Sequence, residues 1–166
     1  PEYIKMISLK TSVLVAAALK MGAIVAEAPE NEANALYNYG LNLGIAFQLQ
    51  DDYLDTFGNP ETFGKQVGGD IIENKKTFLY LKALELSNQE DNNSLKVLFN
   101  KKLENNTQKI NRVKEIYTKN NVTEIIKKEI LTYTNKAFSF LDTLSISENK
   151  KESLKQFGAG LMSRDV

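Results

Sequence analysis

Four side chains with the chemistry to hold a metal ion lie close together in the first half of the chain. Gln48, Asp51, Asp52 and Asp55 are separated by three, four and seven positions. On a helix with about 100° per residue, this spacing places all four on one face, within about a quarter of the circumference. Carboxylates four residues apart suit Mg²⁺, which takes one or two carboxylates together with water and phosphate oxygens.

The same positions would be unfavourable in a helix that holds no cation. The three carboxylates lie among apolar residues, which disfavours their charged form, and in the last turns of the expected helix, where the helix dipole is negative. Two such charges about 6 Å apart repel one another by roughly 3 kcal/mol at an effective dielectric constant near 20. The segment 48–55 therefore predicts a site for a divalent cation.

A surface acidic patch paired with lysines is the main alternative interpretation, and a calcium-binding loop is the next. No Lys or Arg falls within one turn of the carboxylates along this helix, and the nearest basic residue in the sequence is Lys65. The run 51–55 also lacks the alternating ligands and the closing Glu of a calcium loop. Both alternatives are therefore weaker than a magnesium site.

Lys10 and Thr11 are the first candidates for an anion site beside that metal. They stand in an apolar segment, flanked by Leu9 and Val13, where a lone ammonium group is costly. The alternative is a lysine whose aliphatic stem lies on the apolar surface while its charge reaches water.

A glycine-rich loop after the carboxylates carries further lysines. Lys65 follows Gly64, and Lys75 comes after the pair Gly68-Gly69. The order of lysine first and glycines after is the reverse of a P-loop, so the loop is a poor match to nucleoside-triphosphate binding. What remains is a carboxylate-lined metal site with several lysines that could bind the same anion.

The elements that must position these residues are helices. The three prolines stand at positions 1, 29 and 60, and no glycine occurs between Gly69 and Gly158, so long segments lack helix breakers. Their apolar residues recur at spacings of three and four, which predicts an all-α protein. The expected elements are helices over Tyr3–Ala28, Glu32–Phe57 (capped by Gly58), Glu73–Leu86, Ser94–Lys102, Thr107–Asn120, Val122–Leu144 and Glu148–Met162, and a loop over Gly58–Ile71.

The first two of these helices are apolar nearly all round, unlike the amphipathic helices that follow. A helix of that kind must be enclosed on several sides, and the later helices are too few to enclose both. We therefore expect the chain to belong to a larger helical bundle or to bury this surface against a partner. In the later helices, the expected buried positions are Leu95, Leu98, Phe99, Ile110, Val113, Ile116, Tyr117, Ile126, Ile130, Tyr133 and Phe140.

The composition excludes several classes of function. The chain of 166 residues is 42% hydrophobic and 25% charged, which is typical of a globular domain. It has no Cys and no His, so disulfide frameworks, Cys/His zinc sites and Ser-His or Cys-His nucleophiles are excluded. Lys+Arg and Asp+Glu both number 21, and this balance argues against a nucleic-acid partner.

No targeting segment is recognisable in the sequence. The chain starts with Pro-Glu-Tyr, without an initiator Met or a signal pattern, which suggests a piece of a longer protein. The most apolar run, Val13–Ala26, is interrupted by Lys20 and is short for a bilayer, so we expect no membrane span. A cytoplasmic location is the corresponding expectation.

In order and spacing, these motifs resemble those of the trans-isoprenyl (polyprenyl) diphosphate synthases. The segment Gln48–Asp55 looks like the second aspartate-rich motif of that family, and Lys10-Thr11 looks like its Lys-Thr pair. The run from Gly64-Lys65 through Gly68-Gly69-Asp70 to Lys75 looks like the loop that follows. A lone Asp-Asp-x-x-Asp is weak evidence, whereas all three elements in order are strong evidence.

The resemblance implies an all-α bundle of the isoprenoid synthase type, usually a homodimer. Such enzymes condense isopentenyl diphosphate with an allylic diphosphate and use Mg²⁺. The resemblance implies that Asp51 and Asp55 ligate the metal and that Asp52 supports the site or contacts metal-bound water. It assigns Asp51, Asp52, Asp55 and Lys65 to catalysis, and Lys10, Thr11, Gln48, Lys65 and Lys75 to the allylic diphosphate.

The chain also departs from the family pattern. The family has an earlier aspartate-rich motif with nearby arginines, whereas Asp51-Asp52 is the only Asp-Asp pair here and Arg112 and Arg164 are the only arginines. Because family members are about twice as long, residues 1–166 are expected to be the C-terminal half of a synthase domain, inactive alone. A terpenoid cyclase-like lyase and a non-catalytic helical subunit that modulates a synthase are the alternatives.

Overall fold

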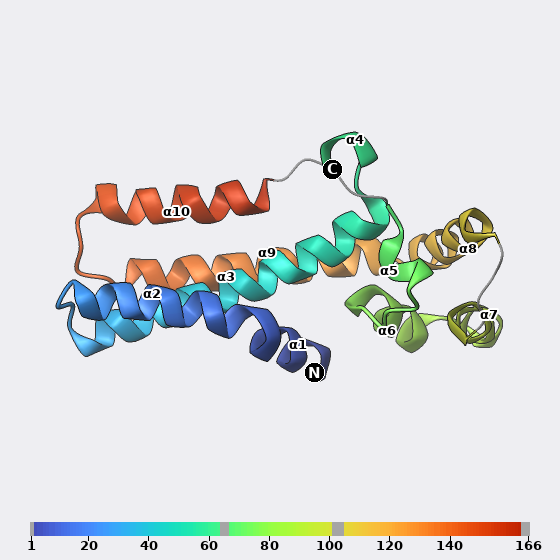
Figure 1. The fold of residues 1–166 in the computed structure, drawn as a ribbon, viewed down its shortest axis with the longest axis horizontal. Coiled ribbons are helices and arrows are strands. Elements are labelled where there is room, and N and C mark those ends of the chain that lie inside the picture. Colours follow the sequence, from blue (N-terminus) through green and yellow to red (C-terminus); the bar gives the residue numbers. More distant parts are fainter. Residues whose placement is uncertain (1, 64–66, 101–104, 164–166) are drawn as a thin grey trace. The chain divides into compact units, whose positions relative to one another are not determined.

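The protein is built from helices, as its residue pattern predicts. The computed structural model describes residues 2–63, 67–100 and 105–163, and these ranges contain no strand. Figure 1 shows the elements in chain order. They are α1 (Glu2–Ile7), the π-helical turn η1 (Ser8–Ser12), α2 (Val13–Val25), α3 (Glu30–Phe57), α4 (Pro60–Phe63), α5 (Gly69–Ile72), α6 (Phe78–Leu86), α7 (Gln89–Asn100), α8 (Asn106–Lys119), α9 (Val122–Asp142) and α10 (Glu148–Met162).

The chain divides into two compact units. Among the described residues, the first unit consists of residues 2–50 and 129–163, and the second consists of residues 51–128 apart from the gaps. The long helices α3 and α9 each contribute residues to both units.

The core of the first unit lies between α3, α9 and α10. Tyr39 of α3 is fully buried, and its hydroxyl donates a hydrogen bond to the carbonyl oxygen of Leu154 in α10 at 2.7 Å. Burial raises the pKa of Tyr39 to about 12, so the hydroxyl keeps its proton at neutral pH. The buried core cluster consists of Ala35, Tyr39, Leu43, Ala137, Leu141 and Leu144.

The core of the second unit is formed by α6, α7 and α8, which contact one another, together with the ends of α3 and α9 that belong to this unit. The rings of Tyr80 in α6 and Phe99 in α7 lie 4.2 Å apart between centroids. Leu79, Leu95, Val113, Ile116, Tyr117 and Ile126 are all at most 1% exposed.

Two helix starts differ from the prediction by five residues, for local reasons. Helix α6 begins at Phe78 instead of Glu73, because the chain turns at residues 73–74, where Asn74 adopts a left-handed conformation with φ of 59°, and residues 75–77 are not helical. The next helix begins at Gln89 instead of Ser94, because the Asn88 side chain accepts a hydrogen bond from the Asp91 amide at 2.9 Å and so caps it.

The expected loop 58–71 contains two short helices, α4 and α5. Gly58 closes α3 by donating its amide to the carbonyl oxygen of Leu54 at 2.8 Å, and it does so without the left-handed conformation expected of a glycine cap. Helix α10 has the predicted bounds, and α3 begins two residues earlier than predicted.

Four of the later apolar positions expected to be buried are only partly buried: Leu98, Ile110, Tyr133 and Phe140. In α8, Val113, Ile116 and Tyr117 are buried as predicted. At the start of this helix, however, Lys109 is 2% exposed while its neighbour Ile110 is half-buried.

The two apolar helices have opposite environments. Most of α3 is buried, whereas the stretch Glu2–Val25 is largely exposed, with Leu14 at 77% and Val25 at 84%. This stretch is longer than the run 13–26 considered in the sequence and, by length and composition alone, could cross a membrane; 22% of its most apolar window is buried. One such helix is weak evidence for a membrane span, because the core helix of a soluble protein and an N-terminal signal sequence pass the same test.

Candidate functional site

The three carboxylates lie near the end of α3, as the sequence predicts, and belong to the second unit. Asp51 and Asp55 are half-buried, whereas Asp52 is only 3% exposed. Asp51 and Asp55 are four residues apart and therefore face the same side of the helix. The two accessible carboxylates are thus the pair with the spacing suited to a metal ion.

Asp55 holds the glycine-rich loop against the end of α3. Its Oδ2 accepts a hydrogen bond from the Asp70 amide at 2.9 Å, and its carbonyl oxygen accepts one from the Gly68 amide. Gly68 has a φ of 87°, and a Cβ atom there would lie 2.7 Å from Ile110, so this position requires glycine. The glycines therefore let the loop fold back onto the carboxylate.

Asp52 is connected to the start of α6. Its Oδ2 accepts a hydrogen bond from the amide of Phe78, the first residue of α6, at 3.5 Å. The first amides of a helix have no partner within the helix, and the positive end of the helix dipole favours a carboxylate there. The buried position and this contact support a structural role for Asp52, next to the accessible pair.

Lys75 is held by two acidic side chains of the same loop. Its Nζ lies 2.8 Å from Oε2 of Glu73 and 2.9 Å from Oδ1 of Asp70. Hydrogen bonds to Glu73 and Asp70 raise the pKa of Lys75, so it is charged at neutral pH. Lys65 and Gly64, which the sequence places in the same loop, lie outside the described residues.

The other predicted anion-binding residues lie in the first unit. Lys10 and Thr11 are part of η1; Lys10 is exposed, and Thr11 is half-buried. The Thr11 hydroxyl donates a hydrogen bond to Oε1 of Gln48 in α3 at 3.3 Å. Lys10 also lines a pocket of about 600 Å³ together with Glu2, Lys5, Met6 and Leu9.

Lys109 is a charged residue that the sequence analysis missed. It is 2% exposed, and its Nζ donates hydrogen bonds to Oδ1 of Asn74 at 2.6 Å and to the carbonyl oxygen of Ile72 at 3.5 Å. Burial lowers the pKa of Lys109. Its position four residues before Val113, on the apolar face of α8, is the sequence signal that could have identified it.

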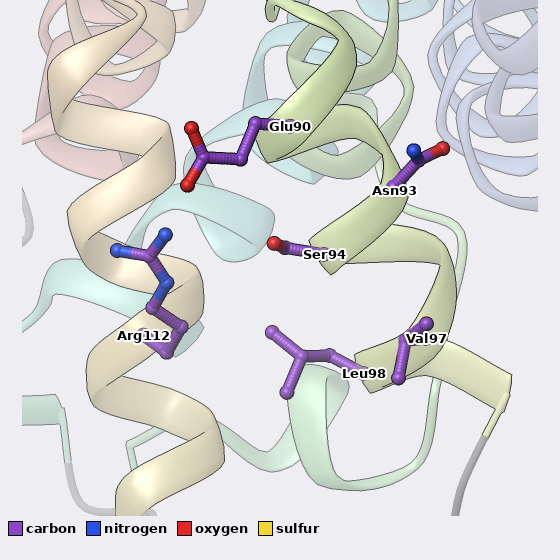
Figure 2. A pocket seen from close by; sticks show the side chains of 6 residues that line it. All are labelled: Glu90, Asn93, Ser94, Val97, Leu98 and Arg112. Carbon is purple, nitrogen blue, oxygen red and sulfur yellow. The ribbon is translucent and has the colours of Figure 1, made fainter.

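A separate pocket of about 470 Å³ lies between α7 and α8, and none of the residues that line it is a predicted site residue. Figure 2 shows Arg112 of α8 facing Glu90, Ser94 and Leu98 of α7. The guanidinium of Arg112 lies 3.1 Å from Glu115 and 3.6 Å from Asp91. Because these acidic partners already neutralise Arg112, we do not place the function in this pocket.

The donor set at the end of α3 is suited to a divalent metal ion that takes its remaining ligands from water or phosphate oxygens. Within the described ranges, no group of three or more acidic side chains is placed to hold a metal ion by itself. Asp51 and Asp55 are two half-buried carboxylates, and Mg²⁺ is commonly bound by one or two carboxylates together with substrate phosphates and water.

Comparison with known proteins identifies similar chains. Residues 1–119 match the family model described as polyprenyl synthetase. The chain is 47% identical over 94 residues to the short chain isoprenyl diphosphate synthase of Methanothermobacter thermautotrophicus, an alignment that covers 57% of this chain and 29% of the relative.

Solved structures of prenyl diphosphate synthases are similar to this chain over its whole length. A crystal structure of a geranylgeranyl pyrophosphate synthase is 46% identical with a TM-score of 0.92, covering 100% of this chain and 52% of that one. A polyprenyl synthase from Caulobacter crescentus CB15, complexed with calcium and isoprenyl diphosphate, is 31% identical with a TM-score of 0.89, covering 99% of this chain and 49% of that one. The chain thus spans about half the length of these structures.

Proposed function

Because this chain belongs to the polyprenyl synthetase family, we propose that it forms part of a prenyltransferase that condenses isopentenyl diphosphate with an allylic diphosphate. One observation carries this proposal beyond family membership. The glycine-rich loop folds back so that the Asp70 amide donates to Asp55, while the carboxylates of Asp51 and Asp55 stay accessible. A metal ion and an anion can therefore meet at this end of α3.

Asp51 and Asp55 would hold the metal ion, and Mg²⁺ is the ion that we propose. When bound, it supplies positive charge that stabilises the negative charge developing on the leaving diphosphate. The complex of the Caulobacter polyprenyl synthase with calcium and isoprenyl diphosphate supports a divalent ion in this role. Asp52, which is buried, supports the site by fixing the start of α6.

The lysines would bind the allylic diphosphate. Lys75 is charged, and its Nζ must exchange Glu73 and Asp70 for phosphate oxygens when the substrate arrives. We assign the same role to Lys10, Thr11, Gln48 and Lys65 by position in the family motifs, with Lys65 also in the catalytic set.

The reaction needs no cysteine or histidine, and the chain has neither. The allylic carbon–oxygen bond breaks and leaves a delocalised cation and a diphosphate, whose charge the lysine ammonium groups stabilise. The alkene of isopentenyl diphosphate attacks the cation to form the new carbon–carbon bond. The proton then lost from the adduct passes to the departing diphosphate.

The complete enzyme needs a second acidic motif that this chain does not contain. The only Asp-Asp pair is Asp51-Asp52, and the solved relatives are about twice as long. We propose that residues 1–166 act as the C-terminal half of a synthase domain that works as a homodimer in the cytoplasm. By itself the chain would bind a prenyl diphosphate without turning it over.

Calorimetric titration of the purified chain with geranyl diphosphate, with and without Mg²⁺, tests the site. We expect binding that requires Mg²⁺, and a loss of at least tenfold in affinity for Asp51→Asn. Unchanged affinity in that variant would contradict the metal role. A prenyl-transfer assay on the same sample tests the need for another motif, since turnover by the chain alone would refute it.

A further inference from the structure

The two residues Lys10 and Thr11 lie in an unusual piece of backbone. The helical stretch from Glu2 to Val25 contains one π-helical turn, η1, and the two residues lie in it. The backbone remains right-handed helical on both sides, at Ile7 and at Val13. Single π-turns within α-helices are rare and occur frequently at functional sites.

The π-turn lies in very close contact with α3. A Cβ atom added at Gly44 would lie 2.8 Å from both the Cα and the Cβ atoms of Ser12 and 3.0 Å from its Oγ. Because one of these atoms belongs to the backbone, a change of side-chain rotamer cannot relieve the overlap. Ser12 is fully buried, so the contact has no solvent-filled gap into which it could relax.

This contact is adjacent to a pair of residues assigned to the diphosphate. Thr11 precedes Ser12, and Gln48 lies one turn after Gly44 on α3, where its Oε1 accepts the hydrogen bond from the Thr11 hydroxyl at 3.3 Å. All of these residues belong to the first unit. The separation between Ser12 and Gly44 therefore sets the separation between Thr11 and Gln48.

We propose that Gly44 is a positioning residue that sets how closely the π-turn approaches α3, and with it the placement of Thr11 and Lys10. This inference rests on the proposed function, because it assumes that these two residues bind a diphosphate. A methyl group at position 44 would move η1 away from α3, lengthen the contact between Thr11 and Gln48 and weaken diphosphate binding.

Two other glycines provide matched controls for a Gly→Ala change. Gly40 lies one turn earlier on α3 and faces α2 instead of η1. A Cβ atom there would lie 2.9 Å from the Cα of Ala16 and 2.8 Å from Leu19 Cδ1, so Gly40→Ala separates α3 from α2 without a direct overlap at η1. Gly22 of α2 has no atom within 4 Å of an added Cβ, so Gly22→Ala reports the effect of helix propensity alone.

The test measures the affinity for inorganic pyrophosphate in the presence of Mg²⁺ by calorimetry, and the Tm, for the full chain and these variants. We expect Gly44→Ala to lower the affinity at least tenfold. We expect Gly40→Ala to lower the Tm by a comparable amount with less than a threefold change in affinity, and Gly22→Ala to leave the affinity unchanged. Equal losses of affinity for Gly40→Ala and Gly44→Ala, or no loss for Gly44→Ala, would overturn the inference.

A second variant separates spacing from stability, and it also serves if Gly44→Ala fails to fold. Ser12→Gly removes two of the three atoms that the new methyl group would meet. If Gly44→Ala folds, adding Ser12→Gly should restore part of the lost affinity. If Gly44→Ala does not fold, the double variant should bind pyrophosphate with an affinity within threefold of that of the wild type. A weaker affinity in the double variant than in a folded single variant, or no binding by a folded double variant, would contradict the proposal.

Ser12→Ala tests whether the hydroxyl of Ser12 acts instead of the spacing. Its buried Oγ has no hydrogen-bond partner, so its removal should leave both affinity and Tm nearly unchanged. A loss of affinity equal to that of Gly44→Ala would assign the effect to the hydroxyl and overturn the inference. If the wild-type chain binds no pyrophosphate at all, the proposed function itself fails, which is a distinct result.

Discussion

Asp52 and Asp55 are three residues apart on α3 but are engaged in different ways. Asp52 is 3% exposed and accepts the amide hydrogen of Phe78 at the start of α6, whereas the half-buried Asp55 accepts that of Asp70 in the loop. The carboxylate with the least exposure thus contacts the start of another helix, and the more exposed Asp51 and Asp55 are the two that we assign to the metal ion. Sequence spacing alone does not make this distinction, because all three acids share one helix face.

We predict that Asp52→Asn lowers the stability by about 1–2 kcal/mol, because it removes a buried charge from the N-terminus of α6. Asp51→Asn should lower the Tm less, because Asp51 is half-buried and its change also relieves repulsion between the acids. Thermal denaturation of the two variants compares these effects. A larger loss of Tm in Asp51→Asn than in Asp52→Asn would contradict the assignment.

Asp91 makes the stability of the folded protein depend on pH. Its side chain is 1% exposed, and its carboxylate lies 2.7 Å from Nζ of Lys119 and 3.6 Å from the guanidinium of Arg112. The hydrogen bond from Lys119 lowers the pKa of Asp91. A carboxyl group whose pKa is lower in the folded state stabilises the fold above its unfolded pKa, near 4, and loses that contribution as the pH falls through the folded value.

We therefore predict that Asp91→Asn lowers the Tm at pH 7. The difference in Tm between the variant and the wild type should become smaller as the pH falls below about 4. Melting curves recorded by circular dichroism between pH 3 and pH 7 measure this. As a control, Glu115→Gln removes an exposed partner of Arg112, and its Tm should differ only slightly from that of the wild type at every pH. If the Tm difference for Asp91→Asn stays constant down to pH 3, the charge of Asp91 contributes little to the stability of the fold.

At the scale of elements, the turn between α5 and α6 depends on a buried cation. Lys109 of α8 donates to Asn74, which is in a left-handed conformation, and to the carbonyl of Ile72. This turn also carries Lys75, which we assign to the diphosphate. A residue of α8 thus holds a loop that is distant in sequence and close to the carboxylates of the same unit.

We predict that Lys109→Met, which keeps the volume but removes the donor, speeds hydrogen exchange at the amides of residues 72–77 by at least tenfold. Lys114→Met on the same helix is the control, because Lys114 instead lies over the ring of Phe57, 5.4 Å from its centroid. Exchange measured by mass spectrometry compares the two. Equal acceleration in both variants would contradict a specific role for Lys109.

The helices were predictable where breakers and apolar spacing mark them, as in α3 and α10. The π-turn was not, because the residues Ser8–Ser12 contain no proline or glycine that would mark an irregular turn. The late start of α6 was missed for another reason, since the turn at Asn74 depends on Lys109, a contact between segments far apart in the sequence.

At the scale of the molecule, the main unexplained surface is the apolar side of η1 and α2. Leu9, Leu14, Met21, Ile24 and Val25 are each more than half exposed. The apolar first helix was expected to be enclosed by a larger bundle or buried against a partner, and this chain spans about half the length of the solved structure that it matches.

We predict that the isolated chain self-associates through this side as its concentration rises. Replacing Leu14 and Val25 by Lys should shift the chain toward monomer without lowering the Tm, because these side chains are 77% and 84% exposed. Sedimentation velocity at several concentrations measures the change. Association that persists unchanged in the double variant would place the contact elsewhere.

The 28 uninterrupted residues of α3 also constrain how this segment can vary in length. Inserting one residue between Gln48 and Asp51 would turn the carboxylates by about 100° around the helix axis and move them about 1.5 Å along it. Seven inserted residues, close to two full turns, would restore the direction but shift the acids by roughly 10 Å. The segment can therefore tolerate exchanges of side chains far better than gains or losses of residues.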